Sequence, residues 1–447
     1  MIFTIFKCFY GYLNLFYYCM YLNVTNKSIH NDIYYSKQIQ KHIEYCGCMM
    51  IKMVQWILPK YNLIHGDTIL YKTLSNLYDN CIEHSLNHTE YIYLNEFKSD
   101  INDEYKIIRL IGSGSIGQVY EVKHKINGQH FALKVLHPNI TIQFHIFYYF
   151  INIILFFIDY KRYLPIDNIN KFMRSLYEQV NLNNECKNMN IFKNMYNECD
   201  IINIPTHYKS SSNILIMDYL PGCMHNSEQY KLYGIYKISK LIMYLSIFSL
   251  NSALNNKLHG DLHIGNWSIN TRTNTINIYD FGYCYNISKE EFSIIEKLIN
   301  NPFSIESLDM FLHYYINKEY NSKLKNEYIY ERYKEEIHTL FTELNVIQVQ
   351  EIISNLFKFC LKYNILLSNA CLNSILVFLQ LISIYEKTGF LENRSKQTKI
   401  NSTLINICKT YNICPLLKAY LEEDLDNTLV LGNFNTLNKY NNLKKYI

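Results

Sequence analysis

The feature that most constrains this sequence is a set of three glycines placed between two strand-like segments. The run IGSGSIGQVYEV spaces Gly112, Gly114 and Gly117 as G-x-G-x-x-G. Further on, Asn127 and Gly128 separate two runs rich in strand-forming residues, and an Asn-Gly pair in that setting predicts a β-hairpin. The glycines therefore join two strands, a third strand follows, and the loop between the first two can approach a ligand closely because its glycines carry no side chains.

Lys134 lies in the predicted third strand, inside A-L-K-V, with apolar residues on both sides. An isolated lysine is usually a solvated surface residue, but this setting favours a function. A glycine loop followed by a strand lysine is typical of sites that hold nucleotide phosphates. A dinucleotide-binding fold would need a helix directly after the glycines, whereas 118–124 is strand-like. We predict that the loop contacts the nucleotide through Ile111, Gly112, Ser113, Gly114, Ser115, Ile116, Gly117, Gln118 and Val119.

Two motifs with acidic residues follow in the second half of the chain. HGDLHIGN runs from 259 to 266, and IYDFG runs from 278 to 282. Their order matches H-x-D-x-x-x-x-N followed by D-F-G, the pair found in the phosphoryl-transfer site of protein kinases. Asn266 and Asp280 supply oxygen ligands suited to Mg²⁺, and Asp261 can accept or orient the proton of an attacking group. Together with the glycine loop and Lys134, these motifs predict ATP or ADP and Mg²⁺ as cofactors.

Lys134 requires a carboxylate partner, and Glu178 and Glu185 are both candidates. They lie seven residues apart and can share one face of a helix. The residues alone leave this choice open. A hinge is predicted in ILIMDYLPG, an apolar strand that ends at a Pro-Gly break, where Met217 and Tyr219 are the candidates for nucleotide contact. His263 has no metal-ligand partner at helical spacing and is predicted either to be structural or to form a local hydrogen bond.

Taken together, these motifs resemble the ABC1/ADCK/UbiB family of atypical, protein kinase-like kinases, over roughly residues 51–390. The run K-M-V-Q from Lys52 to Gln55 partly matches the family's K-x-G-Q extension, and V-L-H-P at 135–138 matches the end of a family strand. The family's E-A-x-N motif falls on residues 185–188, so the resemblance selects Glu185 over Glu178 as the partner of Lys134. By the same resemblance, Asp261, Lys134 and Glu185 are the expected catalytic residues.

The resemblance implies a mixed α+β, two-lobed, protein kinase-like fold. A small β-sheet N-lobe and a helical C-lobe are expected, preceded by a helical extension. The expected division is an apolar leader and linker (1–50), the extension (51–104), the N-lobe with a helical insert (105–218), the C-lobe (219–390) and a C-terminal tail (391–447).

Several positions depart from the family pattern. Val54 stands where the family has glycine, and Gln179 and Asn181 stand where it has an acidic E-x-D pair. Gly260 precedes Asp261, as in this family and in aminoglycoside phosphotransferases, where ordinary protein kinases have arginine. Many relatives carry an alanine-rich nucleotide loop, whereas this loop is glycine-rich. No A-P-E follows D-F-G, which leaves little of the platform that protein kinases use for peptides.

Composition limits the possible partners. The formal charge is +4, with 43 Lys and Arg against 39 Asp and Glu, and the basic residues are dispersed, so no nucleic-acid partner is expected. The 13 Cys are scattered apart from Cys46 and Cys48, which indicates free thiols in a reducing intracellular compartment.

Two apolar segments bear on membrane contact. Met1–Leu22 is rich in Tyr and Phe but is interrupted by polar residues, so it is predicted either to lie at a membrane interface or to pack on the body of the protein. Phe144–Phe157 is too short for a span and is predicted to be a buried helix. The first of these alternatives would give the protein a lipid or membrane surface as a partner through the N-terminal segment, and the second would not.

The leading hypothesis is an ATP-binding, Mg²⁺-dependent atypical kinase or ATPase, and the resemblance implies a link to ubiquinone or isoprenoid-lipid metabolism. The acceptor substrate stays open. Two alternatives remain: a protein Ser/Thr kinase, which the glycine-rich loop favours and the absent A-P-E disfavours, and a non-catalytic nucleotide-binding scaffold. An aminoglycoside or choline kinase shares H-G-D-x-x-x-x-N, but is not expected to carry this glycine loop or the residues 52–55.

Overall fold

The structure is a computed structural model. It describes residues 2–24, 32–78, 83–157, 160–162, 164–197, 199, 201–223, 244–245, 248–249, 251–263, 265–300, 304–324, 331–332, 335–336 and 349–387. The predicted tail at 391–447 lies outside the described residues.

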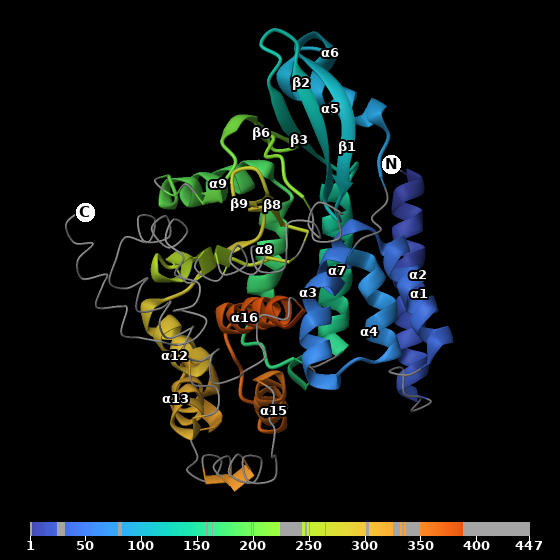
Figure 1. Ribbon diagram of the computed structural model, residues 1–447. Helices are drawn as coiled ribbons and strands as arrows, with labels where there is room; N and C mark the ends of the chain where they lie inside the picture. The colour runs from blue at the N-terminus through green and yellow to red at the C-terminus, as the bar shows by residue number, and fades with distance from the viewer. Residues whose placement is uncertain are drawn as a thin grey trace, which may run out of the picture.

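A set of helices precedes the first strand. Those within residues 2–74 lie at the right of Figure 1, and the last two lie at the top beside the strands. Asp32 begins α2 by accepting a hydrogen bond from the backbone of Tyr35, and Thr68 begins α4 by accepting one from Tyr71. Gly47 joins α2 to α3 with φ +91°, a conformation that favours glycine. The elements are α1 (Ile2–Val24), α2 (Ile33–Cys46), α3 (Cys48–His65), α4 (Ile69–Leu74), η1 (Ser75–Tyr78), α5 (Leu86–Phe97) and α6 (Ile101–Glu104).

Five antiparallel strands form the lobe at the top of Figure 1, in the order β1-β2-β3-β6-β5. Asn127 and Gly128 lie in the turn between β2 and β3, where Gly128 has φ +71°, so the predicted hairpin is confirmed. Lys134 on β3 pairs in register with Val119 on β2 and Leu215 on β6. The strands are β1 (Tyr105–Ser113), β2 (Gly117–His124), β3 (His130–Leu136), β5 (His207–Ser210) and β6 (Ile214–Asp218).

Three helices separate β3 from the rest of this sheet: α7 (Ile140–Phe157), α8 (Ile169–Gln179) and α9 (Leu182–Met195), with a short turn of helix η2 (Tyr160–Arg162). The prediction of a buried helix over 144–157 is wrong for one face of α7. Phe144, Phe147 and Ile151 are buried, whereas Tyr149 and Phe156 are 68% and 83% exposed. The segment is apolar on every side, so its sequence does not reveal which face packs on the protein.

The second lobe is mainly helical and carries two small sheets. One sheet has the order β4-β9-β8, and the other pairs β10 with β7. The strands are β4 (Ile202–Asn203), β7 (Lys257–His259), β8 (Trp267–Asn270), β9 (Thr275–Ile278) and β10 (Cys284–Asn286). The described helices are α12 (Lys289–Asn300), α13 (Ile305–Ile316), η3 (Glu319–Leu324), α15 (Val349–Lys362) and α16 (Asn369–Lys387).

The chain therefore has the predicted α+β, two-lobed architecture with a helical extension (Figure 1). One hydrophobic core runs from α1 and α3 through α8 and α9 to α13 and α16, and a second, smaller core lies under α5 and the five-stranded sheet. Within the described part of the chain, no helix combines the length and the apolar character that a membrane crossing requires.

Candidate active site

Lys134 stands at the centre of a buried group of charges between the two lobes. Its Nζ bonds both carboxylate oxygens of Glu185 on α9, at 2.9 and 2.7 Å, and Oδ1 of Asp280 at 3.0 Å. Burial disfavours the charged amine, but Asp280 and Glu185 together raise the pKa of Lys134 above its ordinary value. Lys134 is therefore a cation held by two carboxylates that lie far apart in the sequence.

The structure resolves the choice between the two candidate glutamates. Glu185 is 3% exposed in the first turn of α9, and burial raises its pKa although Lys134 opposes the shift. Glu178 lies exposed on α8. Asn181, one of the two amides at the family's acidic positions, accepts a hydrogen bond from the backbone of Asn183 and so begins α9. Residue 181 thus positions the helix that carries Glu185.

Asp280 is held in place by its neighbours in D-F-G. Its φ is +53°, a left-handed conformation that aspartate tolerates, and the backbone of Gly282 donates to its Oδ1 at 3.2 Å. Phe281 is buried between Phe192 and His259, with ring centroids 5.2 Å from each. Burial opposes ionisation, but Lys134 and Lys52 hold the pKa of Asp280 well below its ordinary value.

Asp261 and Asn266 lie in one loop whose shape is maintained by hydrogen bonds. Asn266 Nδ2 donates to the carbonyl oxygen of Asp261 at 2.7 Å. His259 Nδ1 accepts from the backbone of Asp261 at 3.2 Å, and its Nε2 contacts the carbonyl of Tyr279 at 3.0 Å. Burial lowers the pKa of His259, which favours the neutral imidazole that these two contacts require. His263 Nδ1 accepts from Gly265, which confirms the predicted local hydrogen bond.

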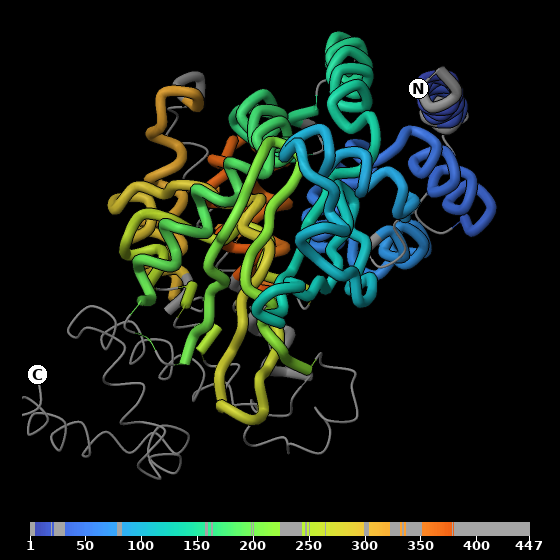
Figure 2. The backbone as a smooth tube through the Cα atoms, turned by 90° about the horizontal axis from the view of Figure 1, so that it is seen from above, coloured from blue at the N-terminus to red at the C-terminus, as the bar shows by residue number. Residues whose placement is uncertain are grey.

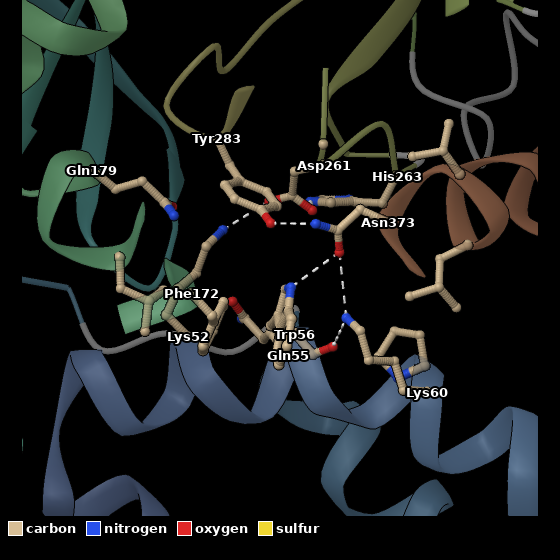
Figure 3. Close-up of a pocket in the computed structure, with 15 residues that line it drawn as sticks. Lys52, Gln55, Trp56, Lys60, Phe172, Gln179, Asp261, His263, Tyr283 and Asn373 are labelled. Atoms are coloured by element: carbon tan, nitrogen blue, oxygen red, sulfur yellow. Dashed lines mark hydrogen bonds and ion pairs between the residues drawn. The ribbon is translucent and has the colours of Figure 1, made fainter. Parts of the chain in front are cut away.

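The extension reaches this loop directly. Lys52 on α3 forms an ion pair with Asp261, with 2.7 Å between Nζ and Oδ2 (Figure 3). Burial opposes ionisation of Asp261, but Lys52, and to a smaller extent His263, hold its pKa below the ordinary value. Val54 lies on the same helix and does not prevent this approach. An acceptor that uses Asp261 must therefore compete with Lys52 or displace it.

The glycine loop joins β1 to β2 as predicted, and the extension also contacts it through hydrogen bonds. Gly114 donates to the carbonyl of Gly117 at 2.9 Å. His137 contacts the loop twice, through its backbone to the carbonyl of Ile116 and through Nε2 to that of Gly114, each at 2.9 Å. The side chain of Gln118 bonds the backbone of His84 in both directions. The side chain of Gln118 is thus engaged with the extension.

The remaining predicted nucleotide contacts lie on strands β1, β2 and β6. Ile111 is 39% exposed on β1, and Val119 is half-buried on β2. Met217 is buried near the end of β6, and Tyr219 follows it. The hydroxyl of Tyr219 accepts from Arg109 at 2.9 Å, which links β1 to the predicted hinge. Ser113, Gly112 and Ser115 complete the turn region of the loop.

The motifs did not identify a cluster of residues beside Asp261. Trp56 on α3 stacks on Phe172 at 3.6 Å between ring centroids, and its Nε1 donates to Asn373 Oδ1 on α16. Asn373 in turn donates to the hydroxyl of Tyr283 at 2.5 Å. Tyr283 also explains Gly260, because a Cβ at residue 260 would lie 2.7 Å from the tyrosine ring.

Among the described residues, no group of three or more His, Cys, Asp or Glu could hold a metal ion on its own. Mg²⁺ is usually bound through one or two carboxylates together with substrate phosphates. Asp280 and Asn266 offer the hard oxygen donors that Mg²⁺ prefers, and 39% of the Asp280 side chain remains exposed. The donor set therefore fits the predicted ion.

Comparisons with known proteins identify a family for this chain. The ABC1 atypical kinase-like domain matches residues 76–309, more than half of the chain. Among solved structures, the Rv3197–erythromycin complex from Mycobacterium tuberculosis has 14% identity and a TM-score of 0.42, covering 68% of this chain and 83% of that one. The Cydia pomonella granulovirus kinase PK-1 has 15% identity and a TM-score of 0.26, covering 46% and 61%.

No curated protein matches the sequence. The match to the ABC1 domain supports a function of the atypical kinase type. It also agrees with the order of the glycine loop, the strand lysine and the two acidic motifs along the chain. This chain belongs to the ABC1 family of atypical kinase-like proteins.

Proposed function

We propose that the protein is an ATP-binding, Mg²⁺-dependent atypical kinase or ATPase. The observation that carries the proposal is the contact of Lys134 with both Glu185 and Asp280. Burying the charges of Lys134 and Glu185 is costly unless they are paired in good geometry, so this arrangement favours a retained function over chance. A phosphoryl-transfer site requires a fixed cation beside the metal-binding carboxylate, and these residues supply it.

Each residue then has a separate role. The backbone of the glycine loop and the Lys134 ammonium bind the nucleotide phosphates, while Glu185 keeps Lys134 oriented. Asn266 and Asp280 hold Mg²⁺, which when bound neutralises charge on the phosphate oxygens. Asp261 orients the attacking hydroxyl or water and holds its proton. Met217 and Tyr219 contact the nucleotide at the hinge.

The ion pair between Lys52 and Asp261 bears on the acceptor. Lys52 pairs with Asp261 at 2.7 Å. In this arrangement the hydroxyl group of an extended peptide would have to displace Lys52 to reach the Asp261 carboxylate. Together with the absent A-P-E, this favours water, a small molecule or a lipid over a protein substrate. The family resemblance adds ubiquinone or isoprenoid-lipid metabolism as the proposed setting.

A paired assay with labelled ATP tests this function. We expect purified protein with Mg²⁺ to release phosphate or label a small acceptor. Asp280→Asn should abolish turnover and weaken binding of the Mg²⁺–nucleotide, whereas Asp261→Asn should lower turnover with nucleotide affinity nearly intact. Label appearing on the protein itself would favour the protein kinase alternative. Unchanged turnover in Asp280→Asn would refute the metal assignment, and nucleotide binding without turnover would indicate the scaffold.

We also propose that the protein contacts a membrane surface through α1. The inward face of α1 carries the buried Cys8 and Tyr12, and Tyr12 lies 4.3 Å from Phe150 of α7 between ring centroids. The outward face carries exposed apolar or aromatic residues at helical spacing, namely Phe6, Phe9, Tyr10, Leu13, Tyr17 and Met20. Such a face suits the boundary between lipid headgroups and acyl chains.

The neighbouring helices extend this surface. α1 and α7 run side by side at one edge of the molecule in Figures 1 and 2, and α7 adds the exposed Tyr149, Ile153 and Phe156. The sequences of α1, α2 and α7 contain three lysines and one glutamate, which favours an anionic surface.

Flotation with lipid vesicles tests the membrane proposal. Binding to vesicles that contain phosphatidylglycerol should fall when Phe6, Phe9 and Leu13 are replaced by serine. A matched variant with serine at the exposed Tyr91 and Leu94 of α5 should bind like the unaltered protein. Equal binding by all three proteins would exclude α1 as the contact surface.

A further inference from the structure

A small cavity lies beside Asp261, and no residue of the glycine loop is among the residues that line it. Its volume is ≈ 50 Å³, enough for a few water molecules or one small polar group. Helices α3, α8 and α16 and the loop of Asp261 enclose it (Figure 3). Because Asp261 belongs to the wall, a group bound here lies next to the carboxylate to which we assign the orientation of the acceptor.

Lys60 is the unexpected residue in this wall. It is 5% exposed, and its Nζ lies 3.4 Å from the centroid of the Trp56 ring. Nζ donates to the carbonyl of Trp56 at 3.0 Å and reaches Asn373 Oδ1 only at 3.5 Å, the limit of a hydrogen bond (Figure 3). An ammonium group has three donors, so Lys60 is incompletely satisfied by these contacts.

Lys60 also lacks an opposite charge at close range. Among the described residues, no carboxylate lies within ion-pair distance of its Nζ, whereas Lys52 in the same wall is paired with Asp261. An unpaired ammonium in an apolar site is costly, and burial accordingly lowers the pKa of Lys60 well below its ordinary value. Binding of an anion would remove this cost by supplying the missing charge.

The charges that line the cavity also favour the binding of an anion. Two lysines, Lys52 and Lys60, face one carboxylate, Asp261, and His263 also lines the cavity. The wall of α8 contributes the amide Gln179 in place of a charge. The cavity therefore carries an excess of one positive charge when both lysines are protonated. Trp56 and Phe172 add aromatic surface to the wall, and an apolar wall strengthens an ionic contact inside the cavity.

We propose that this cavity binds one small anionic group, a carboxylate or a phosphate, carried by the phosphoryl acceptor, with Lys60 as its counter-ion. The assignment of the bound group to the phosphoryl acceptor rests on the proposed function. The anion site itself does not require turnover. It assigns the acceptor to the class of acidic small molecules or acidic lipid headgroups, and it makes Lys60 a residue that determines specificity.

Thermal unfolding of the full chain, saturated with ADP so that the nucleotide site is filled, tests the anion site. We expect acetate and inorganic phosphate, added at constant ionic strength, to raise the Tm in a saturable way. In Lys60→Met the half-saturating concentration should rise about tenfold or more, because a charge-assisted contact is lost. Without added anion, Lys60→Met should unfold at a higher temperature than the unaltered protein, because the unpaired buried ammonium is gone.

Lys72→Met provides the matched control, since Lys72 is an exposed lysine of the same extension, on α4. It should keep the saturable rise in Tm. The proposal fails if the unaltered protein shows no saturable rise with either the free anions or vesicles that contain phosphatidic acid, or if Lys60→Met retains the rise at the same concentration. Vesicles with phosphatidic acid replace the free anions in a second arm: a Lys60-dependent rise with vesicles but not with phosphate identifies a lipid headgroup, and the reverse identifies a soluble acceptor.

The Asp280→Asn variant separates this proposal from the proposed function. A variant without turnover that keeps the Lys60-dependent rise in Tm supports the anion site on its own. If the unaltered protein turns over ATP but shows no such rise, the anion site is refuted and the phosphotransferase function stands.

Discussion

The contact between Lys52 and Asp261 joins the extension to the loop that carries the acceptor-side carboxylate. The two side chains are 14% and 25% exposed, so solvent screens the pair only weakly. Because Lys52 holds the pKa of Asp261 below its ordinary value, ionised Asp261 adds stability that is fully present above the unfolded-state pKa. That stability is lost as the pH falls through the lower pKa of the folded state.

Without Lys52, ionisation of Asp261 should destabilise the folded protein instead of stabilising it. Lys52→Met should cost about 2–3 kcal/mol of unfolding free energy at pH 7, because it leaves a buried carboxylate without its partner. Burial then raises the pKa of Asp261, so the cost should shrink as the pH falls toward about 4. Urea unfolding at both pH values measures this. The double variant Lys52→Met/Asp261→Asn should recover most of the loss at pH 7, and a cost independent of pH would contradict the pairing.

Residues that carry chemistry in one contiguous run could be found from the sequence. The HGDLHIGN and IYDFG motifs fix the types and spacings of Asp261, Asn266 and Asp280. In the structure Asn266 bonds the backbone of Asp261, and Asp280 pairs with Lys134. The Lys60 cavity could not be found in this way. Trp56 and Asn373 are 317 positions apart, and a contact of that kind leaves no local pattern. The choice of Glu185 over Glu178 likewise required the resemblance, since both sit at helical spacing.

At the scale of single elements, two glycines of the glycine loop differ in how much space a side chain would have. A Cβ at Gly117 would lie 2.4 Å from the carbonyl oxygen of Val135, whereas a Cβ at Gly112 would meet no atom within 4 Å. Gly117→Ala should therefore push β2 away from β3 and cost about 1–3 kcal/mol of unfolding free energy, as overpacking does. Gly112→Ala should change it by a few tenths of a kcal/mol. Urea unfolding compares the two variants, and similar costs would rule out the close approach at 117.

The segment before α5 restrains the same loop through two histidines. His84 and His137 face each other with 2.9 Å between their Nδ1 atoms, so one nitrogen must donate and the other accept. Burial, followed by the neighbouring His137 and His88, lowers the pKa of His84 to about 3. The neutral pair therefore adds stability above the unfolded-state pKa of about 6.5, which is lost as the pH falls below that value.

Hydrogen exchange measures this tether. As the pH is lowered from 7 to 5, protection of the amides in the glycine loop, corrected for intrinsic exchange, should fall in the unaltered protein. The fall should be smaller in His84→Gln, because the glutamine at this position cannot gain a proton. His145 is exposed on α7, so His145→Gln should behave like the unaltered protein. Protection that does not change with pH in any of the three proteins would show that the histidine pair does not hold the loop.

Elements with a strong local pattern were predictable, and those without one were not. The Asn-Gly turn made the β2–β3 hairpin predictable, because Gly128 readily adopts the positive φ of +71° found in this turn. The face of α7 could not be assigned, because its residues are apolar on all sides. The side on which α1 packs became clear only from Gly11, where a Cβ would lie 2.7 Å from the backbone nitrogen of Cys46.

At the scale of the whole molecule, the extension is part of the main core. Trp56 in α3 and Trp267 in β8 belong to the same hydrophobic cluster, and α3 also contacts α7, α8 and α15. The expected division into an extension and two lobes describes the order of elements along the chain, but side chains from all three meet in that core. The sequence could not reveal this, because packing between distant helices depends on their final arrangement.

The two tryptophans allow a test of this shared core, since the chain has only these 2. Trp267→Phe leaves Trp56 as the reporter of the extension, and Trp56→Phe leaves Trp267 as the reporter of the C-lobe. In each variant, we expect the urea midpoint by tryptophan fluorescence to coincide with the midpoint by far-ultraviolet circular dichroism, because residues of one packed core lose their contacts together. If fluorescence of Trp56 changes at a lower urea concentration than the circular dichroism, the extension unfolds by itself, and Lys52 and Lys60 would then leave the active site before the lobes open.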